Sequence, residues 1–219
     1  DCLLSRGLGD VYKRQSVDGA RIAWVNATYI TEDTDALAAK SGGELTEMSV
    51  RLANEAAKYR SLPGLSYDTK RKLNILASGL TLPAPMRPGA AEELSTLTTK
   101  MSSFYGKGRG TLDGKPINGS DIEAAMGESR DPAKLKEMWV SWHDSVGAPM
   151  RSDYAKMTAL ANEGSVELGF KDTGALWRSS YDMTPDQFAA LTDKLWSEVE
   201  PLYKALHTYV RAVSYTHLR

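Results

Sequence analysis

The chain has 219 residues and a net charge of −1; 42% of its residues are hydrophobic, 25% are charged, and its one cysteine is Cys2. This composition is typical of a globular protein with enough apolar residues for a core. It gives no electrostatic reason to expect a nucleic-acid partner, which requires a concentrated basic face. It also excludes a disulfide framework, and no apolar run approaches the roughly 20 residues of a membrane span.

The amino-terminal part predicts two helices. Apolar residues recur at helical spacing over about 20–40, although the polar segment 31–35 interrupts them. The spacing resumes after Ser-Gly-Gly (41–43) and continues over 45–59. Leu-Pro-Gly (62–64) then predicts the end of the second helix.

The middle of the chain predicts a loop, a helix and a turn-rich segment. Residues 81–89 contain three prolines and predict a loop, because proline removes a backbone donor and restricts the residue before it. A helix is predicted over 92–105, and the glycine-rich segment 106–119 predicts a small hairpin. We interpret this segment as a solvated loop rather than a phosphate-binding loop, because no strand-to-helix GKS or GKT pattern accompanies it.

Capping patterns mark the next two helix starts. Ser120 and Glu123 fit a capping box, and Asp131 followed by Pro132 fits an N-cap with proline at the first helical position. An apolar stripe continues from there to Gly147; it comprises Leu135, Met138, Trp139, Trp142 and Val146. Gly147 predicts the end of that helix.

The last predicted helix begins at the Thr-Pro-Asp-Gln of residues 184–187 and contains Pro201, which should kink it. The sequence has no self-similarity at periods of 30 to 45 residues, which disfavours a helical-repeat protein. The predicted fold class is therefore all-α.

The two ends of the chain differ from what lies between them. DNA that encodes Ser5–Gln15 by one choice of codons has a reverse complement that encodes Val-Ser-Tyr-Thr-His-Leu-Arg, which is the sequence of residues 213–219. We therefore expect 1–15 and 213–219 to be a leader and a tail read from sequencing-adapter DNA, and we leave them out of the fold prediction. The native segment is then 16–212.

Four blocks of this segment carry a family resemblance: Trp24–Thr34, Trp139–Met150, Tyr154–Tyr181 and Leu195–Arg211. They resemble, in the same order, the angiotensin-converting enzyme family of zinc peptidyl-dipeptidases, here as a bacterial-type member. The segment Gly-Phe-Lys-Asp-Thr-Gly-Ala-Leu-Trp-Arg-Ser-Ser-Tyr is the most specific match. Animal members carry a cysteine pair after the helix predicted over 92–105, and this chain has none there.

The resemblance implies a mostly helical fold divided by a deep cleft, with amino-terminal helices that form a lid. Residues 16–212 would be the amino-terminal third of one catalytic domain. The intact enzyme would use zinc, release dipeptides from the carboxyl termini of peptide substrates, and be periplasmic or secreted. A gluzincin site requires an H-E-x-x-H helix, and the resemblance places it beyond Ala212. We therefore expect no catalytic residue and no zinc ligand in this chain, and an inactive fragment.

None of the three histidines belongs to such a motif. His143 is followed by Asp-Ser-Val-Gly and His207 by Thr-Tyr-Val-Arg, while His217 lies in the adapter-derived tail. We predict that His143 is packed and hydrogen-bonded, and that His207 is a surface or half-buried helix residue.

Arg178 is the one functional residue that the resemblance assigns, as a ligand of the chloride ion that some family members bind. A buried guanidinium stays charged and therefore requires an anion. Equally, Arg178 could pair with Asp182 one turn later or stack on Trp177. Asp172 is interpreted as the N-cap of a helix that begins at Thr173 rather than as a catalytic acid.

The positions of the tryptophans favour a packing role over a functional role. Trp139, Trp142, Trp177 and Trp196 fall at helical core positions. Trp24 lies in the first, lid-like helices of the resemblance, where packing is favoured over a role in substrate entry.

Three functional hypotheses remain open on the sequence alone. The leading one is the amino-terminal part of a zinc peptidyl-dipeptidase. The first alternative is a non-enzymatic α-helical interaction module, whose amphipathic faces bind partner helices. The second is a family member that has lost its zinc ligands.

Overall fold

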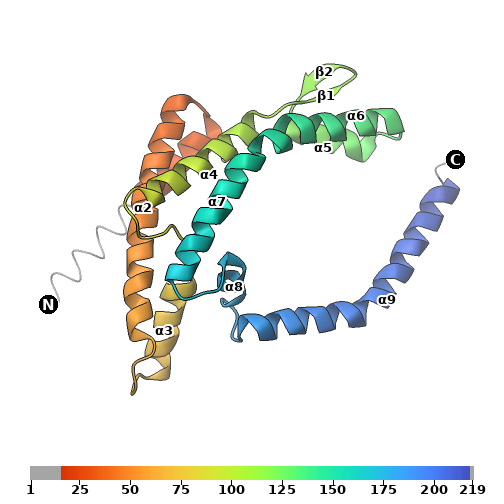
Figure 1. Ribbon diagram of the computed structural model, residues 1–219. Helices are drawn as coiled ribbons and strands as arrows, with labels where there is room; N and C mark the ends of the chain where they lie inside the picture. The colour runs from red at the N-terminus through yellow and green to blue at the C-terminus, as the bar shows by residue number, and fades with distance from the viewer. Residues whose placement is uncertain (1–15, 218–219) are drawn as a thin grey trace. The chain divides into compact units, whose positions relative to one another are not determined.

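The computed structural model describes residues 16–217, and the predicted leader 1–15 lies outside the described residues. Two compact units divide the chain, with the boundary between Thr173 and Gly174. Both are helical, and one two-stranded hairpin is the sheet structure of the described part, so the all-α prediction is confirmed (Figure 1). No helix within 16–217 is long and apolar enough to cross a membrane.

The first unit begins with two helices that meet at the polar break predicted over 31–35. One helix covers 16–28, and α2 follows at Glu32–Tyr59. Thr31 caps α2 in a reciprocal box, because its hydroxyl accepts from the Thr34 amide (3.2 Å) while the Thr34 hydroxyl accepts from the Thr31 amide (2.9 Å). The break is thus a capped helix start.

The prediction of a break at residues 41–43 is wrong, because α2 continues through Gly42 and Gly43. A Cβ at Gly42 would lie 2.4 Å from the Ser95 Oγ, and one at Gly43 would lie 3.1 Å from the Glu92 Cα. Both glycines therefore allow α2 to approach the neighbouring helix closely, and α2 ends only at Tyr59, before the predicted Leu-Pro-Gly stop.

Helix α3 (Tyr67–Ser78) has no counterpart in the sequence analysis. Its start carries a recognisable signal, since the Ser66 hydroxyl accepts from the Thr69 amide at 3.2 Å. α3 packs against α2 (Figure 1).

The predicted proline-rich loop is confirmed over 81–89, and it leads into α4 (Ala90–Lys107). Unlike most loops it is partly buried, at Pro83–Pro85. Gly164 permits this burial, because a Cβ there would lie 2.2 Å from the Pro83 carbonyl oxygen.

The predicted hairpin is also confirmed, as antiparallel strands β1 (Gly110–Leu112) and β2 (Lys115–Ile117). Its two turn residues, Asp113 and Gly114, both have positive φ, 52° and 71°, as a tight hairpin turn requires. Glu137 accepts hydrogen bonds from the amides of both, at 3.1 and 2.9 Å. The Gly114 amide, together with Thr111 and Asp113, lowers the pKa of the Glu137 carboxyl below its ordinary value.

The predicted capping box at Ser120 is wrong, because helix α5 (Gly119–Glu128) begins earlier. Its N-cap is Asn118, whose Oδ1 accepts from the Asp121 amide at 2.9 Å and whose Nδ2 donates to the Asp121 carboxylate at 2.7 Å. The amide side chain satisfies both groups, so the helix starts there.

Helix α6 (Pro132–Trp142) starts as predicted, with the Asp131 side chain accepting from the Ala133 amide. The predicted end at Gly147 is wrong. The chain passes through a π-helical turn, His143–Gly147, directly into α7 (Ala148–Glu167). Gly147 keeps right-handed helical angles, so the helix continues through it, and Pro149 lies in the first turn of α7.

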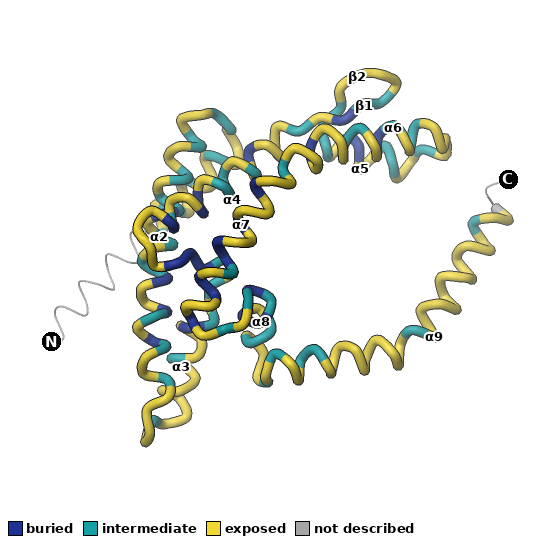
Figure 2. The backbone as a smooth tube through the Cα atoms, in the orientation of Figure 1, coloured by how far each residue is buried: buried dark blue, intermediate teal, exposed yellow. Residues whose placement is uncertain are grey.

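The core of the first unit lies where α2, α4 and α7 meet the buried loop, as the dark segments of Figure 2 show. Its buried residues are Val50, Ala84, Ala90, Leu94, Met157 and Leu160. An ion pair joins α4 to α7 beside it, with the Lys100 Nζ 2.7 Å from the largely buried Asp153 carboxylate.

The second unit consists of α9 (Pro185–His217) and most of α8 (Thr173–Arg178). Thr184 and Gln187 cap α9 reciprocally, at 3.2 and 3.0 Å, as predicted. The helix contains Pro201 and bends in its middle part (Figure 1). It also continues beyond Ala212 through the predicted tail as far as His217, because no glycine or proline stops it there.

The prediction of core positions is wrong for three of the four tryptophans to which it applied, and Trp24, for which packing was favoured, is exposed too. Trp24, Trp139, Trp177 and Trp196 are each exposed by half or more within 16–217, and only Trp142 is partly buried. Helical spacing predicts which face of a helix is apolar, but it does not predict whether another element covers that face.

Candidate functional site

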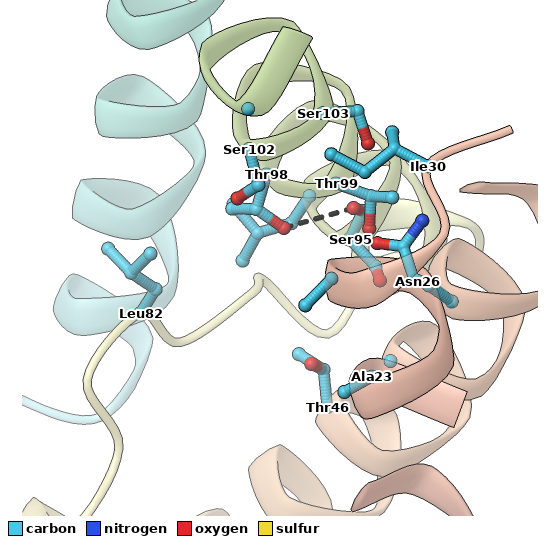
Figure 3. Close-up of a pocket in the computed structure, with 15 residues that line it drawn as sticks. Ala23, Asn26, Ile30, Thr46, Leu82, Ser95, Thr98, Thr99, Ser102 and Ser103 are labelled. Atoms are coloured by element: carbon cyan, nitrogen blue, oxygen red, sulfur yellow. Dashed lines mark hydrogen bonds between the residues drawn. The ribbon is translucent and has the colours of Figure 1, made fainter. Parts of the chain in front are cut away.

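A pocket of about 550 Å³ lies between the helix over 16–28, α2 and α4 (Figure 3). The first helix contributes Ala23 and Asn26, and α2 contributes Gly42 and Thr46. Apolar side chains, including Ile30, Leu82 and Leu94, also line the pocket. Helix α4 contributes five hydroxyl-bearing residues: Ser95, Thr98, Thr99, Ser102 and Ser103. The Thr98 hydroxyl is engaged with the Ser95 carbonyl oxygen at 2.9 Å (Figure 3).

Asp35 joins the three helices around this pocket. Its Oδ1 accepts from the Asn26 Nδ2 at 2.6 Å and also from the Ser103 Oγ. The Lys107 Nζ lies 3.9 Å from the other oxygen. A carboxylate held by three donors fixes these helices relative to one another, so Asp35 has a structural role beside the pocket.

The sequence analysis did not identify Asp35. The partners of this residue are 9, 68 and 72 positions away in the chain, and no local motif brings them together. The signal nearest to it, the Thr31 cap of the same helix, indicates the helix start and says nothing of the carboxylate.

The histidines are not brought together. The His143 Nδ1 lies 2.7 Å from the Trp139 carbonyl oxygen, and its ring stacks on Trp139 at 3.9 Å. The predicted hydrogen bond is thus confirmed, but the ring is exposed rather than packed in a core. His207 is exposed on α9, 5.9 Å from the Tyr203 ring centroid. The His217 side chain lies outside the described residues.

Residues 16–217 do not fit a zinc site. Within this range no three side chains of His, Cys, Asp or Glu lie close enough together to hold a metal ion. We therefore derive no catalytic step through zinc from these residues.

Arg178 ends α8, and its surroundings are unusual for a cation. Its Nε is buried and has no hydrogen-bond partner. A buried donor of this kind carries a free-energy penalty unless it is paired. Helix α8 begins at Thr173, as the interpretation of Asp172 expected, and the Thr173 amide donates to the Asn162 side chain at 3.0 Å.

Comparison with known proteins identifies the family. The peptidase M2 family model, described as angiotensin-converting enzyme, matches residues 7–218. This range overlaps both terminal segments, whose adapter origin stays a prediction. The chain is 34% identical to angiotensin-converting enzyme of Rattus norvegicus over 197 residues, which is 86% of this chain and 15% of the rat protein.

Two further relatives agree. The chain is 32% identical to angiotensin-converting enzyme of Mus musculus over 86% of its own length and 15% of that protein. It is 37% identical to the Mesocricetus auratus enzyme over 59% of its own length and 10% of that protein. The chain thus spans about a seventh or less of the length of these relatives, and it belongs to the angiotensin-converting enzyme family.

Proposed function

We propose that residues 16–212 are the amino-terminal part of a bacterial-type zinc metallopeptidase that releases dipeptides from the carboxyl termini of peptides. The observation that carries this proposal is the family match over 7–218. The predicted zinc motif and its general base would lie in a part of the protein outside this chain. The separate chain would therefore be inactive.

The distribution of burial supports an incomplete domain. Monomeric proteins rarely expose large contiguous apolar surfaces, yet α9 has no buried residue within Pro185–Thr216, despite its apolar stripe. Trp139 and Trp177 are exposed as well. The rest of a catalytic domain would cover such faces.

When bound in the intact protein, zinc would activate a water molecule and polarise the peptide carbonyl. This chain would contribute the framework: Asp35 holds three helices together, and the pocket beside it lies at the amino-terminal, lid-like helices of the resemblance.

The function is tested with the complete reading frame cloned from genomic DNA of the source. The full-length protein should release a dipeptide from a peptide with a free carboxyl terminus, and a chelator should abolish this. The same peptide with an amidated terminus is the matched control and should resist cleavage. The 219-residue chain, assayed under the same conditions, should show no activity. A natural stop codon soon after Arg211 would contradict the proposal and favour the interaction module.

We also propose that Arg178 binds chloride in that enzyme, supported by its buried, unpartnered Nε. Titration with chloride should raise the activity of the full-length enzyme, and Arg178→Gln should remove this dependence. Arg109→Gln is the control, because the Arg109 guanidinium donates to the carbonyl oxygens of Gly108 and Lys107, at 2.7 and 3.1 Å. Activity that is equally chloride-dependent in Arg178→Gln would refute this role.

A further inference from the structure

The junction between β2 and α5 contains a chemically reactive pair, Asn118 followed by Gly119. An asparagine before a glycine is prone to deamidation, because glycine has no side chain to hinder the attack of its amide nitrogen on the asparagine side chain. Asn118 is partly exposed, so water can reach it. The other asparagines of the chain precede larger residues; they are Asn26, Asn54, Asn74 and Asn162.

Packing explains why a glycine follows Asn118. A Cβ on Gly119 would lie 2.7 Å from the Trp142 Cη2 and 3.2 Å from its Cζ2. The Trp142 ring also meets the edge of Tyr105, with ring centroids 5.5 Å apart. A side chain at position 119 would therefore displace a ring that is already packed.

Capping explains why the residue before it is an asparagine. The Asn118 Oδ1 accepts from the Asp121 amide at 2.9 Å, and the Asn118 Nδ2 donates to the Asp121 Oδ2 at 2.7 Å. Asparagine and aspartate cap helices about equally well, but an ionised aspartate has no donor for the Asp121 carboxylate. The fold therefore favours both members of the reactive pair.

We propose that Asn118 is a site of spontaneous deamidation, and that the modification weakens the cap of α5. The Gly119 amide nitrogen loses its proton and attacks the Asn118 Cγ; a new N–Cγ bond closes a succinimide ring, and Nδ2 leaves as ammonia. Water then opens the ring. Cleavage at Cγ leaves aspartate, and cleavage at the main-chain carbonyl carbon leaves isoaspartate, so one water is consumed for each ammonia released.

The folded chain restrains this reaction through the Asn118 side chain. Both polar atoms of its amide are bound to Asp121, so the side chain must leave Asp121 before its Cγ can meet the Gly119 nitrogen. The Gly119 N–H itself is one of the first four of α5, which have no acceptor within the helix. Release of the Asn118 side chain is therefore the step that the fold controls.

The aspartate product weakens the cap because it changes a donor into a charge. It keeps an acceptor for the Asp121 amide, but a carboxylate oxygen takes the place of the Nδ2 that lay 2.7 Å from the Asp121 carboxylate. A second carboxylate is favoured at a helix N-terminus, but this gain is smaller than the loss of a hydrogen bond to a charged group. Isoaspartate lengthens the main chain and moves the carboxylate away from the Asp121 amide.

This inference goes beyond the proposed function and does not rest on it. The residues involved lie within the first unit, and the experiments below require no peptidase activity. The failure of one proposal therefore leaves the other standing.

Mass spectrometry of the full 219-residue chain tests the modification. The chain is incubated at mildly alkaline pH, folded or in guanidinium chloride. Trypsin then releases residues 110–130 as one peptide, because Lys115 precedes proline, and Asn118 is the one asparagine in it. This peptide should change from the amide to the acid mass, more slowly in the folded chain than in guanidinium chloride.

The tryptic peptide 157–171 is the internal control. It contains Asn162, which precedes a glutamate, and it should keep its amide over the same time. A folded chain that keeps the Asn118 amide while the denatured chain loses it overturns the proposal.

Two variants test whether Asp121 restrains the reaction. Asp121→Ala removes the acceptor of the Asn118 Nδ2 and should speed deamidation of the folded chain about two- to tenfold, the factor that corresponds to one hydrogen bond. Glu123→Ala is the matched control, because it removes the same charge from the same helix and leaves both bonds of Asn118 in place. Equal rates in the two variants would refute the restraint.

The variant Asn118→Asp reproduces the aspartate product. Its melting temperature, measured by circular dichroism, should fall by about 2–4 °C, as expected for the loss of one cap in a chain of this length. Asp121→Asn in the same chain should restore most of this loss, because its amide can donate to the new carboxylate. An unchanged melting temperature of Asn118→Asp would overturn the proposed weakening of the cap.

Discussion

Glycines inside helices show that one residue type can have opposite consequences at different positions. Gly164 on α7 and Gly127 on α5 are both helical, and neither has a positive φ. The Pro83 carbonyl oxygen leaves no room for a side chain at Gly164, whereas nothing lies within 4 Å of a Cβ at Gly127. The space around each glycine, not its intrinsic helix propensity, decides its role.

Gly164→Ala should therefore destabilise the protein by about 1–3 kcal/mol, because backbone atoms of the buried loop would have to move. Gly127→Ala should stabilise it by up to about 1 kcal/mol, because alanine favours the helix. Urea unfolding of both variants measures the difference. Equal effects of the two substitutions would show that the loop does not pack on α7 as described.

Asp35 makes the same point for polar residues. Its sequence neighbours mark it as a first-turn residue of α2, where an acidic side chain is common. Only its contacts with Asn26 and Ser103 show that it connects three helices. The pocket beside it was unpredictable for the same reason, whereas Arg178 could be singled out because a family motif includes it.

At the scale of helices, two residues near the start of α5, Asn118 and Ser120, are candidates for its N-cap. Asn118→Ala should cost about 1 kcal/mol, within the range of lost N-caps, because the Asp121 amide would lose its acceptor. Ser120→Ala should have little effect, because Ser120 lies within the first turn of α5 and caps nothing there. Thermal unfolding of both variants compares them; a larger loss for Ser120→Ala would restore the capping box expected from the sequence.

The Glu137 carboxylate on α6 holds the turn of the hairpin, and the strength of this contact should depend on pH. The carboxylate accepts from the backbone of the turn, and its pKa is lowered in the folded state. A carboxyl group with a lowered folded pKa contributes stability that is complete above its unfolded pKa, about 4.3. This contribution is lost as the pH falls through the folded value.

We therefore expect the Gly114 amide resonance to shift as the pH falls below about 4.3, and Glu137→Gln to remove this transition. Glu123→Gln, on the exposed side of α5, should retain it. An unchanged titration of Gly114 in the Glu137 variant would mean that another group controls the turn.

At the scale of the molecule, burial is concentrated in the first unit. Leu94 is 3% exposed in the core formed by α2, α4 and α7, whereas Ile75, on α3, is 57% exposed. Leu94→Ala should lower the free energy of unfolding by about 2–5 kcal/mol, because it leaves a cavity. Ile75→Ala should change it by less than about 1 kcal/mol. Chemical denaturation of the two variants tests whether this core stabilises the chain.

The sequence by itself determined the helical class, the proline-rich loop, the hairpin, the starts of α6 and α9, and the family. These features depend on local periodicity, caps, turn chemistry or motifs, and all of these can be read from the amino-acid sequence. It misplaced the break at Gly42–Gly43, the cap of α5 and the end expected at Gly147, and it assigned exposed tryptophans to a core.

Those outcomes were decided only by the tertiary structure. A glycine becomes a contact or a stop according to what lies against it, and an apolar face becomes core only where another element covers it. Asp35 and Gly164 owe their roles to residues that are distant in the chain. Hydrophobic burial and hydrogen bonding act between atoms that are close in space, so a local pattern predicts which face is apolar but not what meets it.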